Sequence, residues 1–159
     1  MKNNPQNKEV MNMRTIKFRG KNLYNNEWIF GDLIQYESGE MAIFSKKLSQ
    51  YGCEATEMFN RSKVETTTVG QFTGLFDKNG NEIYEGDIIS INGKYPKLVR
   101  YIDDYACFCL ANIEDLDEKM DTGYWHQVSP GWWNSSKRII KVLSNIHDNP
   151  ELINMKKSN

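Results

Sequence analysis

Oxygen-bearing side chains alternate in GQFTGLFDKNGNEIYEGDIISING (70–93), at Asp77, Asn79 and Asn81. A calcium loop of the EF-hand type begins in this way, and it also needs a glycine at its sixth position and a bidentate glutamate at its twelfth. Counting from Asp77, a glutamate is sixth and an isoleucine is twelfth. The pattern therefore does not fit such a loop. We predict a metal-free hairpin turn at Asn79 and Gly80, in which Asp77 hydrogen-bonds the backbone.

Aromatic and basic side chains cluster in GYWHQVSPGWWNSSKR (123–138). Aromatic rings beside cations can stack bases while the cations bind phosphates. The same rings can fill the core of a small domain or anchor a protein interface. If Trp132 and Trp133 lie on a strand, they point to opposite faces, and one of them lies at the surface. The candidate binding residues are Trp125, His126, Trp132, Trp133, Lys137 and Arg138.

Histidine and cysteine give no recognisable catalytic or metal-binding pattern. The two histidines, His126 and His147, lack a partner at metal-ligand spacing, and the three cysteines lack the spacing of a disulfide framework. Cys107 and Cys109 are two apart on an expected strand, so they are expected on one face as small apolar side chains. We predict no metal, no cofactor and no enzymatic activity. An enzyme that uses His126 with an acidic residue would need a concave pocket around it.

Alternating apolar residues and turn signals predict a mainly β protein. TIKFRG places Ile16 and Phe18 on one face and Lys17 and Arg19 on the other. Residues 46–63 are polar and broken, which indicates a loop with a helical turn. Hairpin turns are expected at Asn25-Asn26 and Ser38-Gly39, and further strands in KVETTTVGQFTGLF, DIISI, KLVRYI, ACFCLA and RIIKVL.

Three further local features are expected in the second half of the chain. Ile113, Leu116 and Met120 have the spacing of one short amphipathic helix. SPGWW predicts a turn around Pro130-Gly131, and HDNPELI predicts a short helix with Pro150 at its first position. NEWIFGDLIQY (26–36) and NEIYEGDIISI (81–91) align at an offset of 55. This similarity indicates either chance or two related β units, each with a Gly-Asp corner.

The 159 residues carry a net charge of −1 with a pI near 6.1, which gives no overall attraction to nucleic acid or membranes. Acidic residues dominate 103–121, and basic residues gather elsewhere, including Lys17, Arg19 and Lys21. Such groups are typical of solvated faces, and they can also pair across an interface between identical subunits. The polar opening has no signal-peptide pattern, and no stretch has the length of a membrane span. A soluble protein of the reducing cytoplasm is expected.

Two long motifs, VGQFTGLFDKNGNEIYEGDII and KVLSNIHDNPELI, resemble the signature segments of the YopX family of phage and prophage proteins. That family shows a Gly-Gln-aromatic-Thr-Gly-Leu start, an Asp-Lys-Asn-Gly turn, a Tyr-Glu-Gly-Asp corner and a terminal Asn-Pro-Glu segment. IKFRGKNLYNNEWIFGDLI is similar to the opening of the family. The resemblance covers residues 16–34, 69–91 and 141–153, and little of it extends to 45–62 or 103–136.

The resemblance implies a β-rich fold with the character of a small SH3-like barrel, encoded by mobile genetic elements, and it brings no established activity. We predict a mainly β, SH3-like barrel or roll built from hairpins, with one or two short helices. The predicted regions are a disordered leader (1–13), an N-terminal β-rich region (14–68), a C-terminal SH3-like domain (69–153) and a disordered tail (154–159).

The predicted function is that of a non-enzymatic binding module that acts through protein–protein contacts. Its expected partner is a second copy of itself or a host or phage protein, and no membrane is involved. The alternative is single-stranded nucleic-acid binding through Trp132 or Trp133 with Lys137, Arg138 and Lys141.

Overall fold

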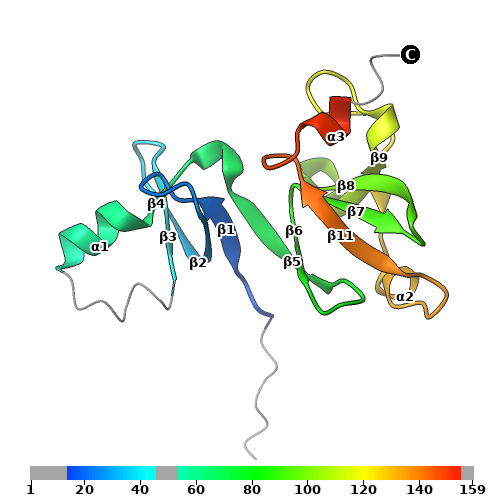
Figure 1. Ribbon diagram of the computed structural model, residues 1–159, viewed down its shortest axis with the longest axis horizontal. Helices are drawn as coiled ribbons and strands as arrows, with labels where there is room; N and C mark the ends of the chain where they lie inside the picture. Colours follow the sequence, from blue (N-terminus) through cyan, green and yellow to red (C-terminus); the bar gives the residue numbers. More distant parts are fainter. Residues whose placement is uncertain (1–13, 46–53, 155–159) are drawn as a thin grey trace, which may run out of the picture.

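The structure is a computed structural model that describes residues 14–45 and 54–154. Two antiparallel sheets lie side by side (Figure 1). The first contains, in spatial order, β4 (Lys63–Val64), β3 (Met41–Phe44), β2 (Trp28–Gln35), β1 (Phe18–Lys21), β5 (Gly70–Phe76) and β6 (Glu82–Tyr84). The second contains β10 (His126–Gln127), β9 (Cys107–Asn112), β8 (Lys94–Ile102), β7 (Asp87–Ile91) and β11 (Ile140–Asn145). The mainly β prediction is confirmed.

Helical segments in the described residues are short. They are α1 (Ala55–Ser62), η2 (Thr66–Thr68), η3 (Asp103–Tyr105), η4 (Ile113–Asp115), α2 (Pro130–Trp133) and α3 (Glu151–Asn154). None of the helices in this part of the chain is long and apolar enough to span a membrane. The predicted leader (1–13), most of the predicted tail and Cys53 lie outside the described residues.

Neither sheet closes into a barrel, which corrects that part of the fold prediction. In the second sheet, β10 and β11 lie at opposite edges and do not pair with each other. β10 has only two residues, so it offers few backbone groups for closure. The individual hairpins follow the sequence, with left-handed turn residues at Asn26 (φ 60°), Gly39 (φ 86°) and Gly80 (φ 83°).

The two sheets have separate cores that share one hairpin. In the first, Ala42, Ile43 and Val64 are buried, and α1 packs on β3. The second core consists of Ile83, Ile89, Val99, Leu110, Trp133 and Ile140. Ile83 comes from β6, which is hydrogen-bonded into the first sheet. The hairpin β5–β6 therefore joins the two halves of the molecule. The boundary at residues 68 and 69 stays a prediction, although β5 pairs with β1 across it.

The helix expected from Ile113, Leu116 and Met120 is absent, and the prediction was wrong. Only the 3-10 turn η4 forms at its start, and Met120 has a φ of 56°. The carboxylate of Asp117 accepts backbone N–H bonds from Lys119 and Asp121, at 2.8 and 2.9 Å. Asp side chains that bond their own backbone in this way compete with a helix. The turn expected at Pro130-Gly131 is instead the start of α2.

The two similar segments are not structurally equivalent, so the interpretation as repeated Gly-Asp corners was wrong. Gly31 lies inside β2, where a Cβ would come within 1.9 Å of the carbonyl oxygen of Phe44. Gly86 lies at a true corner between β6 and β7, with a φ of 83°. Asp32 is exposed, whereas Asp87 is 1% exposed. The Gly-Asp pair therefore allows close packing of two strands in the first segment and a reversal of the chain in the second.

Asp77 organises the predicted turn at Asn79-Gly80, as the sequence indicates. Its Oδ1 accepts the backbone N–H groups of Asn79 and Asn81, at 2.8 and 2.9 Å. Its Oδ2 accepts the Asn81 side-chain amide at 3.0 Å and the backbone N–H of Val142 in β11 at 3.2 Å. Although burial raises the pKa of Asp77, these hydrogen bonds outweigh it and lower the pKa. The turn is thereby fastened to the edge of the second sheet.

Replacing Gly80 by valine should destabilise the fold by about 1–3 kcal/mol, because a β-branched side chain is forced into the left-handed region. The free energy of unfolding in urea measures the change. Gly123→Val is the matched control, because the φ of Gly123 is not left-handed and a side chain at this position would meet no neighbouring atom. Equal losses in the two variants would contradict the assigned turn.

Candidate functional site

The structure divides the predicted binding residues among three places. Trp133 belongs to the second core, with 7% of its surface exposed, and its indole N–H donates to the Phe76 carbonyl oxygen at 3.4 Å. Trp132 is half-buried, with the Arg138 guanidinium 4.5 Å from the centre of its ring. Arg138 also donates to the carbonyl oxygen of Trp132 at 3.0 Å. Because both tryptophans lie on the helical turn α2 rather than a strand, both can pack toward the core.

The other predicted residues do not join this group. Trp125 is half-buried, and its indole N–H donates to the Asp121 carboxylate at 3.0 Å. His126 is exposed on β10, opposite Leu110 of β9. An exposed position on an edge strand does not supply the concave pocket that the His126-based enzyme alternative requires. Lys137 is exposed beyond α2.

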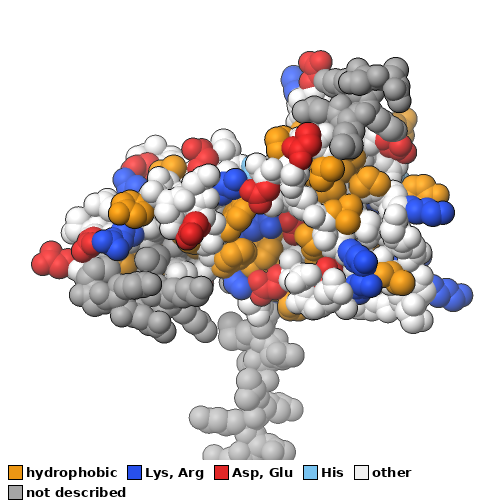
Figure 2. All heavy atoms as spheres, in the orientation of Figure 1, with side chains coloured by type: hydrophobic (Ala, Val, Ile, Leu, Met, Phe, Trp, Pro, Cys, Tyr) orange, Lys and Arg blue, Asp and Glu red, His pale blue; other side chains and the backbone are white. Residues whose placement is uncertain are grey.

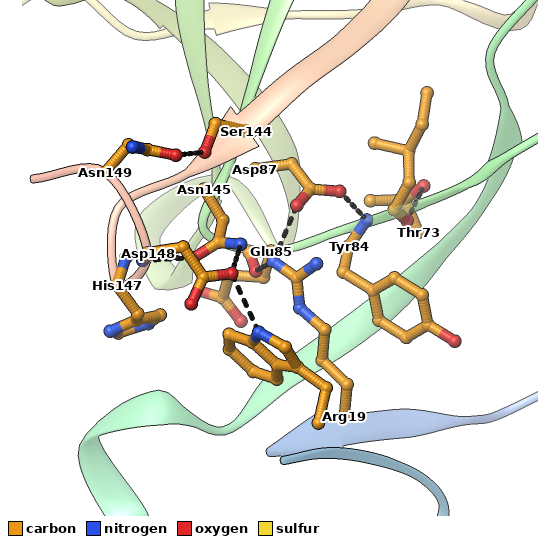
Figure 3. A network of polar contacts seen from close by, with 12 residues as sticks. Arg19, Thr73, Tyr84, Glu85, Asp87, Ser144, Asn145, His147, Asp148 and Asn149 are labelled. Atoms are coloured by element: carbon orange, nitrogen blue, oxygen red, sulfur yellow. Dashed lines mark hydrogen bonds and ion pairs between the residues drawn. The ribbon is translucent and has the colours of Figure 1, made fainter. Parts of the chain in front are cut away.

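A polar network that the sequence analysis did not predict lies where the two sheets meet (Figure 3). Arg19 reaches from β1 toward Asp87 at the start of β7, and the two charged groups are 2.6 Å apart. Their side chains are 9% and 1% exposed, so the ion pair is buried. Arg19 also donates to the carbonyl oxygen of Glu85 at 3.1 Å. The other oxygen of Asp87 accepts the backbone N–H of Tyr84 at 2.8 Å.

Aromatic rings flank the Arg19 guanidinium. The ring centres of Trp28 and Tyr84 lie 4.8 and 5.0 Å from its central carbon. A guanidinium is planar and weakly hydrated, so such rings can cover it while a carboxylate neutralises its charge. The rings thus shield the Arg19 guanidinium, and Asp87 neutralises its charge.

Two glycines permit the close approach of the strands at this junction. A Cβ on Gly70 of β5 would lie 2.5 Å from the Glu85 carbonyl oxygen, which itself accepts from Arg19. Gly86 has a φ of 83°, and its N–H donates to the Val99 carbonyl oxygen at 2.8 Å. The Tyr-Glu-Gly-Asp corner thus presents a carbonyl group and a carboxylate to Arg19.

Asp148 forms a second anchor between the halves of the molecule. Its carboxylate is 2.8 Å from the Lys21 ammonium group and accepts the indole N–H of Trp28 at 2.8 Å. It also accepts the Asn145 side-chain amide at 2.7 Å. His147 packs beside Trp28, with ring centres 5.9 Å apart. The C-terminal segment is therefore held against β1 and β2.

The pKa values at the junction follow from burial and pairing. Burial raises the pKa of Asp87, and the charge of Arg19 opposes this effect. Burial likewise raises the pKa of Asp148, but bonds from Lys21, Asn145 and Trp28 outweigh it and lower the pKa to about 2. Burial, followed by the nearby cations, lowers the pKa of His147, so its imidazole is neutral at pH 7. The ion pairs of Asp87 with Arg19 and of Asp148 with Lys21 therefore join the two sheets.

One face of the first sheet continues outward from this junction as the open face, which we define by the exposed rings of Phe30 and Phe76 and by the buried rings of Phe72 and Tyr84 that connect them. Ring contacts of 5.4–5.5 Å link Phe30 to Tyr84, Tyr84 to Phe72 and Phe72 to Phe76. A hollow of about 540 Å³ lies beside it, lined in part by Ile16, Phe30 and Glu82. Figure 2 shows hydrophobic side chains in the middle of the molecule, with charged side chains among them.

The residues that the sequence analysis missed share one signal. Arg19 and Trp28 come from the first segment that resembles the YopX family, Asp87 from the second and Asp148 from the third. These segments meet at the junction, although the sequence does not show this. Within the described parts of the chain, no three His, Cys, Asp or Glu side chains gather as a group that could hold a metal ion.

Arg19→Met should cost about 3–5 kcal/mol of unfolding free energy, because it leaves the buried carboxylate of Asp87 without its cation. Adding Asp87→Leu should recover part of this loss, which urea unfolding measures. Lys17→Met is the control, since the Lys17–Glu82 pair is about one-third exposed and contributes about 1 kcal/mol or less. Equal losses for Arg19→Met and Lys17→Met, or additive losses in the double variant, would refute the assigned ion pair.

Asp148 should make stability depend on acid pH. Its pKa is about 2 in the folded chain and about 3.9 when unfolded, so its contribution is complete above about pH 4 and is lost as the pH falls toward 2. Asp148→Asn should lower the melting temperature at pH 7 and flatten its decline below pH 4. Asp104→Asn, at an exposed position in η3, is the control. Parallel melting curves for Asp148→Asn and the native chain would count against this role.

Comparison with known proteins agrees with the sequence motifs. A family model described as YopX protein matches residues 17–154. The crystal structure of protein EF1440 from Enterococcus faecalis is similar at 20% identity and a TM-score of 0.46, covering 89% of this chain and 99% of that chain. No curated protein matches the chain. Because the family model spans both sheets and the junction between them, the chain belongs to the YopX family.

Proposed function

We propose that this YopX-family chain is a non-enzymatic binding module that acts through protein–protein contacts at the open face. The observation that supports it most is the exposure of apolar side chains there. Phe30 is 40% exposed and Phe76 52%, and the buried rings of Tyr84 and Phe72 connect them. Ile16, which is 61% exposed, lines the neighbouring hollow together with Phe30. Contiguous exposed apolar patches with polar rims are typical of interaction sites. Phe30 and Phe76 are the proposed anchors.

The charges around the open face favour a protein partner over a nucleic acid. Lys17, Arg19 and Lys21 lie on one side of β1, and a row of free cations there would suit phosphates. Each is paired instead: Lys17 with Glu82, Arg19 with Asp87 and Lys21 with Asp148. The paired charges leave the apolar rings as the main source of binding free energy.

The nucleic-acid alternative loses its best stacking groups. Trp133 is buried, and the Arg138 guanidinium covers one face of the Trp132 ring. A base needs an accessible ring face to stack. The positions of these two side chains therefore support the protein-binding proposal over single-stranded nucleic-acid binding through α2.

The resemblance to the YopX family also suggests where the chain originates, where it works and what fold its C-terminal strands have. We propose a phage or prophage accessory protein that works in the cytoplasm, with SH3-like character in its C-terminal strands. The packing of Ile83 and Leu75 from the hairpin β5–β6 onto the second sheet supports that character. A second copy of the chain is the first partner to test, followed by host or phage proteins.

Truncating the anchors should weaken binding at least about tenfold, because loss of a central aromatic anchor costs about 2 kcal/mol or more. The test variant is Phe30→Ser with Phe76→Ser, and the control is Tyr124→Ser, which removes a 73% exposed ring elsewhere. Light scattering over a concentration series measures self-association, and pull-down from bacterial lysate recovers other partners.

Thermal melts establish that both variants remain folded. The proposal expects self-association, or retention of a partner, that the open-face variant loses and the control keeps. A native chain that stays monomeric and retains no partner would overturn the proposal, as would binding that survives in the open-face variant.

A further inference from the structure

Two cysteine sulfurs lie in contact on β9. The Sγ atoms of Cys107 and Cys109 are 3.7 Å apart. Residues two apart on a strand have Cα atoms about 6.6–6.8 Å apart, so parallel side chains would keep their sulfurs at a similar distance. The two side chains therefore lean toward each other rather than standing parallel, which goes beyond the shared face that the sequence predicts.

The two thiols differ in access to solvent. Cys109 is 0% exposed, whereas Cys107 is half-buried. Both line a hollow of about 210 Å³ together with apolar side chains that include Val99, Leu110 and Trp133. Burial, helped by the neighbouring Cys107, raises the pKa of the Cys109 thiol to about 11. A dissolved reagent can thus reach Cys107 first, and Cys109 can react only with a sulfur delivered beside it.

We propose that Cys107 and Cys109 are a site of reversible oxidation, at which a small disulfide such as glutathione disulfide converts the two thiols into an intrastrand disulfide. The site is independent of the open face and of the partner proposed for it. Cys107 is the sulfur that attacks the small disulfide, and Cys109 is the sulfur that resolves the resulting mixed disulfide.

The reaction balances in two exchange steps. The Cys107 thiolate attacks one sulfur of glutathione disulfide, forms a mixed disulfide and releases one glutathione thiolate. Cys109 then gives up its proton and attacks the Cys107 sulfur, and the bond to the second glutathione breaks. The two cysteines lose two electrons and two protons in total. One glutathione disulfide becomes two molecules of glutathione.

The strand geometry makes this bridge strained and therefore easily reversed. The Cα spacing of about 6.6–6.8 Å lies at the upper limit for a disulfide, so β9 must shorten locally to form the bond. Strained disulfides are more readily reduced. Cys109 is paired with Arg100 of β8 and with Gln127 of β10. Shortening β9 should thus loosen the two-residue edge strand β10 first.

Incubating the full reduced chain with glutathione disulfide tests the proposal. Chymotrypsin cleaves after Phe108, which stands between the two cysteines. Oxidised native chain should lose two hydrogens in its intact mass, and its two chymotryptic fragments should stay linked until dithiothreitol separates them. Cys53→Ser serves as the background, because it removes the third thiol of the chain.

The single variants separate the two roles. In Cys109→Ser, one glutathione should remain bound to Cys107, because the resolving sulfur is gone. In Cys107→Ser, Cys109 should stay unmodified while the chain is folded, as checked by its thermal melt. The proposal fails if the native fragments are not linked, if a bridge forms only through Cys53, or if the glutathione adduct at Cys107 persists equally with and without Cys109. Mapping of the native chain decides the matter even if a variant does not fold.

Discussion

Burying the positive charge of Arg19 between the two sheets is the constraint on which the rest of this structure depends. A guanidinium that is removed from water needs a carboxylate to neutralise its charge and oxygen atoms to accept its N–H groups. Without them, the folded state is destabilised by several kcal/mol. Arg19 obtains these from Asp87 and the Glu85 carbonyl group, both near the Gly86 corner of the other half. The corner therefore has to meet β1 in one position. This requirement sets how the second sheet sits against the first.

Several features of the chain are consequences of that contact. Gly70 has to lack a side chain because β5 passes so close to the Glu85 carbonyl oxygen. Trp28 covers Arg19 and at the same time donates to Asp148, which brings the C-terminal segment to the same place. The rings of Phe30 and Phe76 in the first sheet stay exposed. A rigid junction beside these exposed rings would give the proposed binding module a fixed surface.

Local turn chemistry explains which parts of the fold the sequence predicts well. The turn at Asn79-Gly80 depends on Asp77 and on one left-handed glycine, all within a few residues, so the hairpin could be predicted. The prediction of a helix near Met120 was wrong because the spacing of apolar residues does not show that the Asp117 carboxylate will accept hydrogen bonds from nearby backbone N–H groups. The expectation that Trp132 and Trp133 point to opposite faces holds only on a strand, whereas a helical turn carries both residues.

The junction could not be predicted because its partners are far apart in the chain. Alternation correctly places Arg19 on the face opposite Phe18, and for an isolated sheet that face would be solvated. Only tertiary contact with Asp87 turns the position into a buried one. The available signal was that these residues all lie in the three segments that resemble the YopX family. That signal identifies the residues, but it does not show that they are in contact. The domain boundary predicted between residues 68 and 69 was likewise based on the order of segments along the chain. That order does not reveal that β5, after the boundary, pairs with β1, before it.

Native-state hydrogen exchange tests most directly whether the junction makes the two sheets one cooperative unit. It compares the free energies of opening for backbone amides in β2 and β3 with those in β8 and β9. If Arg19 and its partners couple the halves, the slowest amides of both groups share one free energy of opening and lose protection together in mild denaturant. A first sheet whose amides exchange at a distinctly lower free energy, while β8 and β9 stay protected, would contradict the account.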